Sequence, residues 1–122
     1  TRDFNYVEDI CEAFYAIGES DKTIGKVINA ASNFEISIGE TAKLIKFIMN
    51  SDLEIICEEE RFRPENSEVN RLFGDNSLLL KLTDWNPKFS GKEGFKEGLK
   101  KTIEWFTRNK DFYKNNSKEY II

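Results

Sequence analysis

The sequence opens with TRDFNYVED over residues 1–9, which places an arginine directly ahead of a predicted helix. Apolar side chains recur at helical spacing over residues 7–17, namely at Val7, Ile10, Cys11, Phe14 and Ile17. Arg2 then stands at the end of an extended segment, beside the N-terminus of that helix. A guanidinium group in this place can bind two oxygens of a diphosphate, and the free amides of the first helical turn add to the positive field. The alternative is an ordinary surface arginine that pairs with Asp3 or Glu8.

Downstream of this helix, the apolar pattern predicts short strands between further helices. Strands are predicted at 26–31 and at 53–57, where the runs are mostly apolar. One further helix is predicted to begin at a capping box of Ser37 and Glu40, and another at a second capping box of Ser90 and Glu93. Between them, a short helix is predicted over the leucine-rich residues 77–83. This order predicts an α/β fold that is mainly helical, with a few short strands. Two strands make a marginal sheet, so we expect further strands or a pairing partner outside this chain.

The composition fits one folded domain and excludes several classes of function. Of 122 residues, 39% are hydrophobic and the net charge is −4, so a packed core is expected, and nucleic-acid binding, which needs clustered Lys and Arg, is disfavoured. No apolar run reaches the ~20 residues of a membrane span. Because the sequence has no His, a metal site is not expected. Cys11 and Cys57 are interpreted as small core residues of a cytoplasmic protein.

Two positions besides Arg2 are candidates for binding an anion. Arg63 is preceded by Arg61 and followed by a proline, which could fix both guanidinium groups as an anion clamp. Neutralisation of the acidic residues 58–60 also explains these arginines, and the residues alone favour that explanation. Asn29 closes the first predicted strand and either binds a phosphate or, as its residue type favours, satisfies local backbone groups. The sequence contains no Gly-rich dinucleotide loop and no tyrosine followed four positions later by lysine, so no catalytic or cofactor-binding residue is predicted.

Taken in order, these segments resemble a known family. Residues 1–9 resemble the Arg-Asp-Phe/Tyr-x-Tyr/His-Val-x-Asp segment of extended short-chain dehydrogenases/reductases that act on sugar nucleotides. The segments that follow in that family are similar to VIN at 27–29, SI at 37–38, RPENSEVNRL at 63–72, LTDWNP at 82–87 and the helix at 93–106. The resemblance covers residues 1–108, which we interpret as the C-terminal, substrate-binding part of such a Rossmann-type enzyme. Residues 109–122 are interpreted as a polar C-terminal tail.

The resemblance implies five substrate-binding residues. Arg2 and Arg63 would grip the substrate diphosphate from opposite sides through charge-assisted hydrogen bonds. Phe4 would lie near the nucleotide, and Asn29 would lie on the phosphate side. Asn66 is the nearest match to a residue that approaches the ribose or the base.

The resemblance also implies an activity, that of an NAD-dependent nucleoside-diphosphate-sugar 4,6-dehydratase. In such enzymes NAD oxidises the sugar at C4, water is lost, and the hydride returns at C6. The Ser-Glu-Val form at residues 67–69 favours this reaction over 4-epimerisation. NAD and the catalytic pair would belong to an N-terminal Rossmann half that we expect to be missing, and the parent enzyme is expected to be a homodimer.

The chain alone is therefore expected to bind a sugar nucleotide without turning it over. The alternatives are a fragment of a 4-epimerase, a non-catalytic nucleotide-sugar-binding module, and an interaction module. We also expect the chain to expose apolar surface where the missing half would pack.

Overall fold

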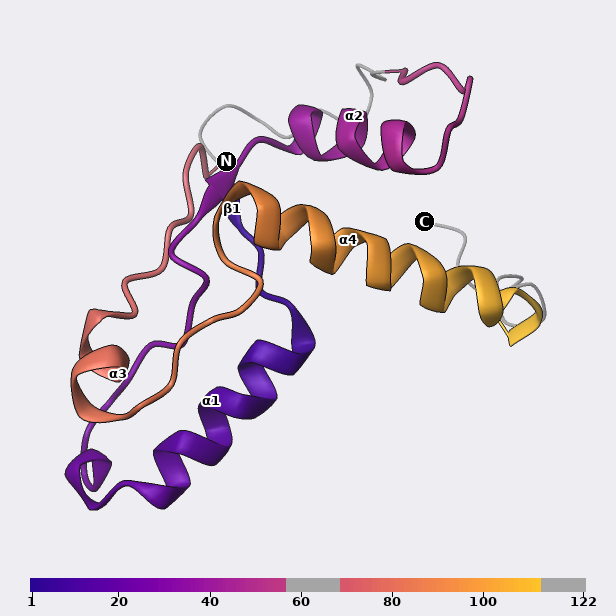
Figure 1. Ribbon diagram of the computed structural model, residues 1–122. Coiled ribbons are helices and arrows are strands. Elements are labelled where there is room, and N and C mark those ends of the chain that lie inside the picture. The colour runs from indigo at the N-terminus through magenta and orange to yellow at the C-terminus, as the bar shows by residue number, and fades with distance from the viewer. Residues whose placement is uncertain (57–68, 113–122) are drawn as a thin grey trace.

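The computed structural model describes residues 1–56 and 69–112 (Figure 1). Its elements, in chain order, are β1 (Arg2–Asp3), α1 (Val7–Glu19), the 3-10 helix η1 (Asp21–Thr23), β2 (Glu35–Ile36), α2 (Ile38–Ile48), α3 (Ser77–Leu82) and α4 (Gly91–Arg108). In Figure 1, α4 runs between α2 on one side and α1 on the other, and α3 lies on the side of α1. The described part is mainly helical, as the sequence predicts.

The sheet of the described residues is small and differs from the predicted one. β1 and β2 pair antiparallel, with Arg2 opposite Ile36 and Asp3 opposite Glu35. The strand predictions at 26–31 and 53–57 are wrong for the described residues, because 26–31 and 53–56 have no regular secondary structure, while residue 57 lies outside the described ranges. An apolar run becomes a strand only where a neighbouring strand takes up its backbone N–H and C=O groups, and no described segment pairs with these two.

The helix starts show where local sequence rules hold and where they fail. At α2, the Ser37 Oγ accepts a hydrogen bond from the Glu40 amide at 3.1 Å, and a Glu40 carboxylate oxygen accepts one from the Ser37 amide at 3.2 Å, so the predicted capping box is confirmed. At α4, Ser90 is the N-cap but its side chain makes no cap hydrogen bond. The Ser90 hydroxyl instead donates to the Ser32 carbonyl at 2.5 Å, so the second capping box is wrong and Ser90 ties α4 to a distant loop.

The helix α1 is longer than predicted, and its buried face matches the predicted apolar pattern only in part, because Ile17 packs against the core while Phe14 is exposed. It continues through Gly18 to Glu19. Its buried residues are Asp9 and Ala13, which lie one turn apart. Cys11 lies two positions from each of them and so points away from that face, and it is exposed. The interpretation of Cys11 as a core residue is therefore wrong, and Cys57 lies outside the described residues.

The core consists of two apolar clusters on either side of residues 1–6. The first is formed by Ala13 of α1, Leu79 of α3 and Trp85, with Ala16, Ile17, Ile28 and Ala30 packed against it. The second is aromatic and joins the N-terminal segment to α4, since Phe4 stacks on Phe95 at 5.7 Å between ring centroids and Tyr6 packs on Phe89 at 4.3 Å. The segment 1–6 therefore links the α1 side of the molecule to the α4 side.

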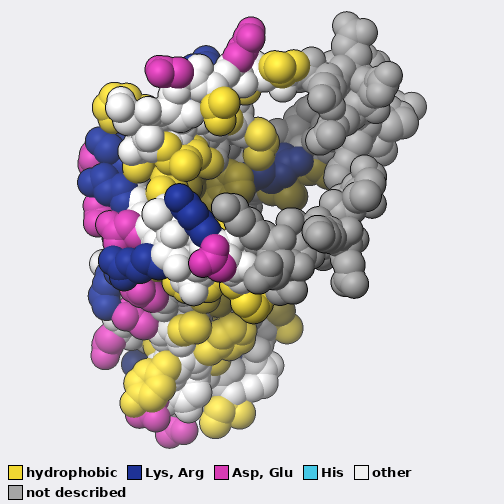
Figure 2. All heavy atoms as spheres, turned by 90° about the vertical axis from the view of Figure 1, so that its right-hand side faces the viewer, with side chains coloured by type: hydrophobic (Ala, Val, Ile, Leu, Met, Phe, Trp, Pro, Cys, Tyr) yellow, Lys and Arg dark blue, Asp and Glu magenta, His cyan; other side chains and the backbone are white. Residues whose placement is uncertain are grey.

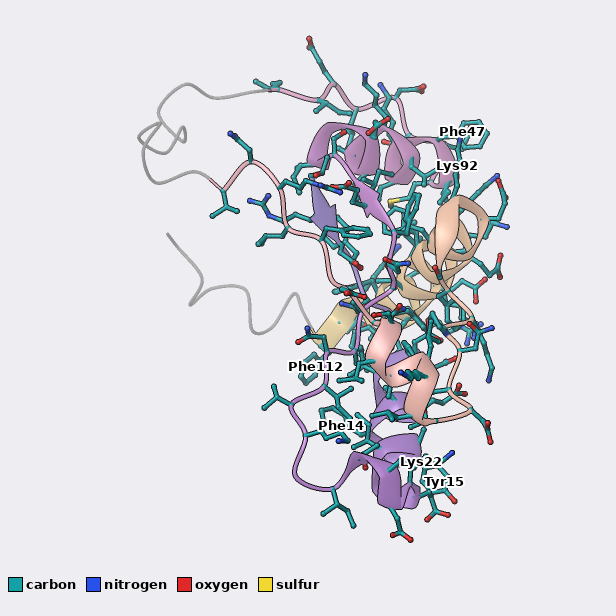
Figure 3. All side chains as sticks on the ribbon, turned by 90° about the vertical axis from the view of Figure 1, so that its left-hand side faces the viewer. Phe14, Tyr15, Lys22, Phe47, Lys92 and Phe112 are labelled. Atoms are coloured by element: carbon teal, nitrogen blue, oxygen red, sulfur yellow. The ribbon has the colours of Figure 1, made fainter. Side chains whose placement is uncertain are left out.

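Many large apolar side chains remain on the surface of the described residues. Phe14 and Tyr15 project outward from α1, and Phe47 projects from α2 (Figure 3). Val27 is 94% exposed in the segment that was predicted to be a strand. The expectation of exposed apolar surface is confirmed for these residues. Within residues 1–56 and 69–112, no helix is long and apolar enough to cross a membrane.

Candidate functional site

Asp3 fixes the backbone around the candidate site. One of its carboxylate oxygens accepts hydrogen bonds from the Ser32 amide at 3.2 Å and the Ser32 hydroxyl at 2.6 Å. The other accepts from the amides of Asn33 and Gly74, each at 3.1 Å. Asp3 thus joins β1 to two loops that are 29 and 71 residues away in the sequence. A single carboxylate that satisfies three backbone amides and one hydroxyl holds these segments at fixed positions.

Gly74 is required at this junction because its backbone lies against the loop before Ser32. A Cβ atom on Gly74 would lie 2.2 Å from the Cβ of Ala31, which is far inside van der Waals contact. The neighbouring Asn76 is 3% exposed, and its side-chain amide donates to the Ala31 carbonyl at 2.9 Å. The loop at 31–33 and the segment at 74–76 therefore form one packed unit with β1.

Arg2 lies where the N-terminal strand meets residues 69–72. Its Nη1 atom donates to the carbonyl of Thr1 at 2.8 Å and to the carbonyl of Val69 at 2.7 Å. The Leu72 amide donates to the Thr1 carbonyl at 3.1 Å and holds the two segments together. Asp3 accepts the hydrogen bonds of the loops described above, and Glu8 pairs with Lys101 at 3.0 Å. The guanidinium of Arg2 is thereby placed beside residues 69–72, the last part of the stretch 63–72.

Arg63 and Asn66, the two site residues predicted in the stretch 63–72, lie outside the described residues. The structure does place the end of that stretch and the two residues after it, residues 69–74, directly beside β1.

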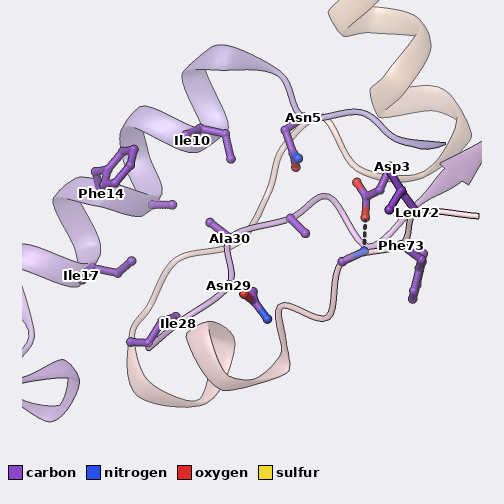
Figure 4. A pocket seen from close by; sticks show the side chains of 13 residues that line it. Asp3, Asn5, Ile10, Phe14, Ile17, Ile28, Asn29, Ala30, Leu72 and Phe73 are labelled. Carbon is purple, nitrogen blue, oxygen red and sulfur yellow. Dashed lines mark hydrogen bonds between the residues drawn. The ribbon is translucent and has the colours of Figure 1, made fainter. Parts of the chain in front are cut away.

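An open pocket of about 530 Å³ lies next to this junction, between α1 and the two loops (Figure 4). Its polar residues are Asp3, Asn5 and Asn29, and its apolar wall combines side chains of α1 with residues of both loops, namely Ile10, Ala13, Phe14, Ile17, Ile28, Ala30, Ala31, Leu72 and Phe73. Asn29, predicted as a site residue, is exposed and lines this pocket. Asn5 was not predicted. It lies within the motif at residues 1–9, at the variable position of that pattern, so no feature of the motif indicated it.

Phe4 is separated from Asn29 by the N-terminal strand. Neighbouring side chains of an extended segment point to opposite sides, so Asp3 faces the pocket with Asn29 while Phe4 faces α4. There Phe4 stacks on Phe95 and lines a second pocket of about 290 Å³ with Tyr6. The structure therefore brings Asn29 and the Asp3 junction together and places Phe4 on the other side.

A second arginine, Arg71, lies at the same junction and was not predicted. Its Nη2 atom forms a 2.6 Å ion pair with Glu35 of β2, and its Nε atom donates to both oxygens of that carboxylate. Its guanidinium lies over the ring of Phe73, 5.1 Å from the centroid, and Phe73 lines the pocket. Arg71 is 36 residues from Glu35 in sequence, so no local spacing could have indicated the pair.

The hydrogen bond from Arg71 lowers the pKa of Glu35 from 4.5 to about 2, and a hydrogen bond from the Thr1 hydroxyl at 2.7 Å adds to the effect. The same hydrogen bond with Glu35 raises the pKa of Arg71. Glu35 is therefore an anion at every pH at which the protein would function, and the edge of the pocket carries a fixed pair of opposite charges.

Asp9, the last residue of the N-terminal motif, has a structural role. It is 3% exposed, and its two carboxylate oxygens accept hydrogen bonds from the amides of Lys88 and Phe89, each at 2.9 Å. The indole N–H of Trp85 donates to the Asp9 carbonyl at 2.9 Å. Asp9 therefore anchors the turn before α4 on the first turn of α1. In the sequence, this role is indicated by the position of Asp9 one helical turn before Ala13, on the buried face of α1.

The pocket wall carries the carboxylate of Asp3, the side-chain amides of Asn5 and Asn29 and a set of apolar side chains, and the guanidinium of Arg2 lies at the neighbouring junction of β1 with residues 69–72. Among the described residues, no cluster of His, Cys, Asp or Glu could bind a metal ion. A pocket of this kind suits a ligand that has both polar and apolar parts.

Comparison with known proteins identifies the family. Residues 1–98 match the GDP-mannose 4,6 dehydratase family, and the chain belongs to it. The chain is similar to human dTDP-D-glucose 4,6-dehydratase, with 34% identity over 123 residues that cover 97% of this chain and 33% of that protein. The predicted resemblance to sugar-nucleotide dehydratases is confirmed.

More distant enzymes of sugar-nucleotide metabolism also match. A trifunctional UDP-glucose 4,6-dehydratase/UDP-4-keto-6-deoxy-D-glucose 3,5-epimerase/UDP-4-keto-L-rhamnose-reductase of Arabidopsis thaliana is 32% identical over 112 residues, covering 92% of this chain and 16% of that protein. A UDP-N-acetyl-alpha-D-glucosaminuronate decarboxylase of Bacillus cytotoxicus is 33% identical over 108 residues, covering 87% of this chain and 32% of that protein. The chain thus spans about a third or less of the length of these relatives. No solved structure matches the chain.

Proposed function

We propose that this chain forms part of the sugar-nucleotide-binding site of an NAD-dependent nucleoside-diphosphate-sugar 4,6-dehydratase. The observation that carries the proposal is the position of Arg2, whose guanidinium lies at the junction of β1 with the segment after Arg63, within the family motif. A planar guanidinium matches a diphosphate because it can bond two oxygens at once. The names of the relatives favour 4,6-dehydration over 4-epimerisation.

The five substrate-binding residues have distinct roles in this proposal. Arg2 and Arg63 neutralise the diphosphate, and Asn29 adds a side-chain amide from the pocket wall. Asn66 approaches the ribose or the base. Phe4 lies toward the nucleotide, and its contact with Phe95 fixes the strand that carries Arg2.

NAD binding belongs to another part of the enzyme in this proposal. The described residues do not fit a dinucleotide, because they contain no Gly-rich turn between a strand and a helix. NAD held by that other part would supply the hydride-transfer chemistry. The residues of this chain hold and orient the sugar nucleotide, and a Rossmann-type part of the enzyme supplies NAD and the catalytic groups.

The exposed apolar side chains around the pocket fit a docking face for that Rossmann-type part. Phe14 and Val27 are among the most exposed apolar side chains of the described residues, and the 530 Å³ pocket lies open beside them. An exposed apolar patch next to a polar site is typical of a ligand cleft between two domains. The whole enzyme is proposed to be a cytoplasmic homodimer.

The test is titration of the whole enzyme with dTDP-glucose, UDP-glucose, UDP-N-acetylglucosamine and GDP-mannose by calorimetry. Arg2→Ala should weaken binding of the preferred ligand by roughly 10- to 100-fold, because a charge-assisted hydrogen bond contributes about 1.5–3 kcal/mol. Arg108→Ala is the matched control, since Arg108 is exposed at the end of α4 and pairs only loosely with Glu104 at 3.5 Å. Equal affinities for the two variants would refute the role of Arg2, and the absence of heat with every sugar nucleotide would refute the proposed function.

A further inference from the structure

A separate apolar groove lies between α2 and α4, away from the pocket at Asp3. It has a volume of about 470 Å³ and is lined by Ile45, Met49, Leu99, Thr102, Ile103, Phe106, Thr107 and Lys110. We call it the α2–α4 groove. Lys110 is its one charged lining residue. Nothing in the proposed function uses this groove.

The groove arises from how the two amphipathic helices present their apolar residues. Ile45 and Met49 lie one turn apart along α2, and Leu99, Ile103 and Phe106 follow at helical spacing along α4. Met49 remains 55% exposed although it lines the groove. Figure 2 shows this face, where hydrophobic side chains gather in a strip beside a surface crowded with charged side chains. An apolar groove of about 470 Å³ with one charged lining residue suits the apolar side chains of a short segment.

The sequence of residues 113–122, YKNNSKEYII, suits such an occupant. Six polar residues, 114–119, separate Tyr113 from the apolar residues 120–122. The chain reaches this segment from the C-terminal end of α4, and Lys110, two residues beyond that end, lines the groove. The attachment point therefore lies at the groove.

The reach of the segment covers the groove. Lys110, just beyond α4, is eleven residues from Leu99, or about 16 Å at the rise of a helix. From Phe112 to Tyr120 an extended chain spans up to about 26 Å. A segment that turns back at the end of α4 can thus place residues 120–122 anywhere along the groove, and the short polar spacer keeps the entropy cost of closing the loop small.

From this geometry we propose that residues 120–122 dock in the α2–α4 groove and pack against Ile45, Met49 and Ile103. The driving force is burial of apolar surface on both sides, helped by the high local concentration of a tethered segment. A second copy of the chain is a poorer occupant, because a stable interface takes about 20–30 residues a side, whereas the groove is lined by eight. The inference is independent of the proposed substrate.

Disulfide trapping tests the proposal in the full 122-residue chain. With Cys11 and Cys57 replaced by Ser, the pair Met49→Cys and Ile121→Cys is oxidised gently at low protein concentration and analysed by mass spectrometry. The control pair is Phe47→Cys and Ile121→Cys, because Phe47 is 74% exposed on α2 but does not line the groove. The first pair should form an intrachain disulfide at least about five-fold faster, since docking raises the effective concentration.

Two results would overturn the proposal: equal rates for the two pairs, or disulfides formed only between chains, which would assign the groove to a second copy. Hydrogen exchange gives an independent readout that needs no cysteine. Ile121→Asp should raise amide exchange at the end of α2 near Met49, whereas Ser117→Asp, in the polar spacer, should not. Unchanged exchange in Ile121→Asp would contradict docking.

Discussion

At the scale of single residues, the carboxylate of Asp9 holds the turn before α4 against α1. Both of its oxygens accept backbone amides, and the side chain is 3% exposed. Asp9→Asn should lower the free energy of unfolding by about 1–3 kcal/mol, because the new amide cannot accept both hydrogen bonds and leaves a buried N–H unsatisfied. Urea denaturation of the chain measures this loss. Glu12→Gln is the control, since Glu12 pairs with Lys88 on the surface and should change stability by less than about 1 kcal/mol.

Glu35 should titrate far below an ordinary glutamate. Its pKa is lowered to about 2, chiefly by the hydrogen bond from Arg71. A depressed folded-state pKa contributes stability that is present above pH 4.5 and is lost as the pH falls toward 2. Carboxyl chemical shifts measured by NMR across pH 1.5–6 should show this midpoint.

Arg71→Gln should move the Glu35 titration back toward 4.5. Glu40 provides the internal control, because its pKa is lowered by hydrogen bonds from Ser37 rather than by Arg71. A Glu35 midpoint that stays near 2 in Arg71→Gln would contradict the assignment. A shift of both carboxyl groups together would point to a general disturbance of the fold.

At the scale of elements, two glycines in different environments should respond in opposite directions to the same substitution. Gly74→Ala places a Cβ 2.2 Å from the Cβ of Ala31, so the loops around Asp3 must separate, and we expect a loss of about 1–3 kcal/mol. Gly18→Ala, inside α1, meets nothing within 4 Å and should gain about 0.5–1 kcal/mol from helix propensity. Thermal or urea unfolding compares the two. A neutral Gly74→Ala would show that the junction is looser than its contacts indicate.

The elements also show which features of the fold can be predicted from sequence. The capping box of α2 was predictable because Ser37 and Glu40 are three residues apart and bond to each other's backbone and side chain. The same pattern failed at Ser90, whose hydroxyl is used by Ser32, 58 residues away. The apolar run at 26–31 carries the side-chain pattern of a strand, but pairing depends on a neighbour that the local sequence does not specify.

For the candidate site as well, local patterns could be predicted from sequence and long-range contacts could not. Family motifs indicated Arg2 and Asn29, and the structure places Arg2 where β1 meets residues 69–72 and Asn29 in the wall of the pocket that Asp3 faces. The hydrogen bonds of Asp3 and the pair of Glu35 with Arg71 span 29 to 71 residues, so their partners are set by the tertiary fold and not by spacing in the sequence. Arg63 and Asn66 remain predictions.

At the scale of the whole molecule, the apolar surface around the 530 Å³ pocket should make the isolated chain self-associate. Phe14 and Val27 flank that region and are 72% and 94% exposed. The double variant Phe14→Glu and Val27→Lys should reduce concentration-dependent association in sedimentation velocity. It places charges on the apolar surface through which two copies would associate, and these charges would lose their water on contact. Circular dichroism should stay unchanged, since neither side chain belongs to the buried core.

Phe47→Glu is the control that distinguishes the apolar face at the 530 Å³ pocket from the other exposed apolar side chains. Phe47 is 74% exposed on α2, on the other side of α4 from α1 (Figure 1), so its replacement should leave self-association through the pocket face intact. In the whole enzyme, the double variant should also weaken sugar-nucleotide binding by loosening the contact between this chain and the Rossmann-type part, whereas Phe47→Glu should not. If both variants reduced association equally, self-association would be nonspecific and would involve any exposed apolar side chain, not one docking face. The contact between this chain and the Rossmann-type part would then have to lie on another face.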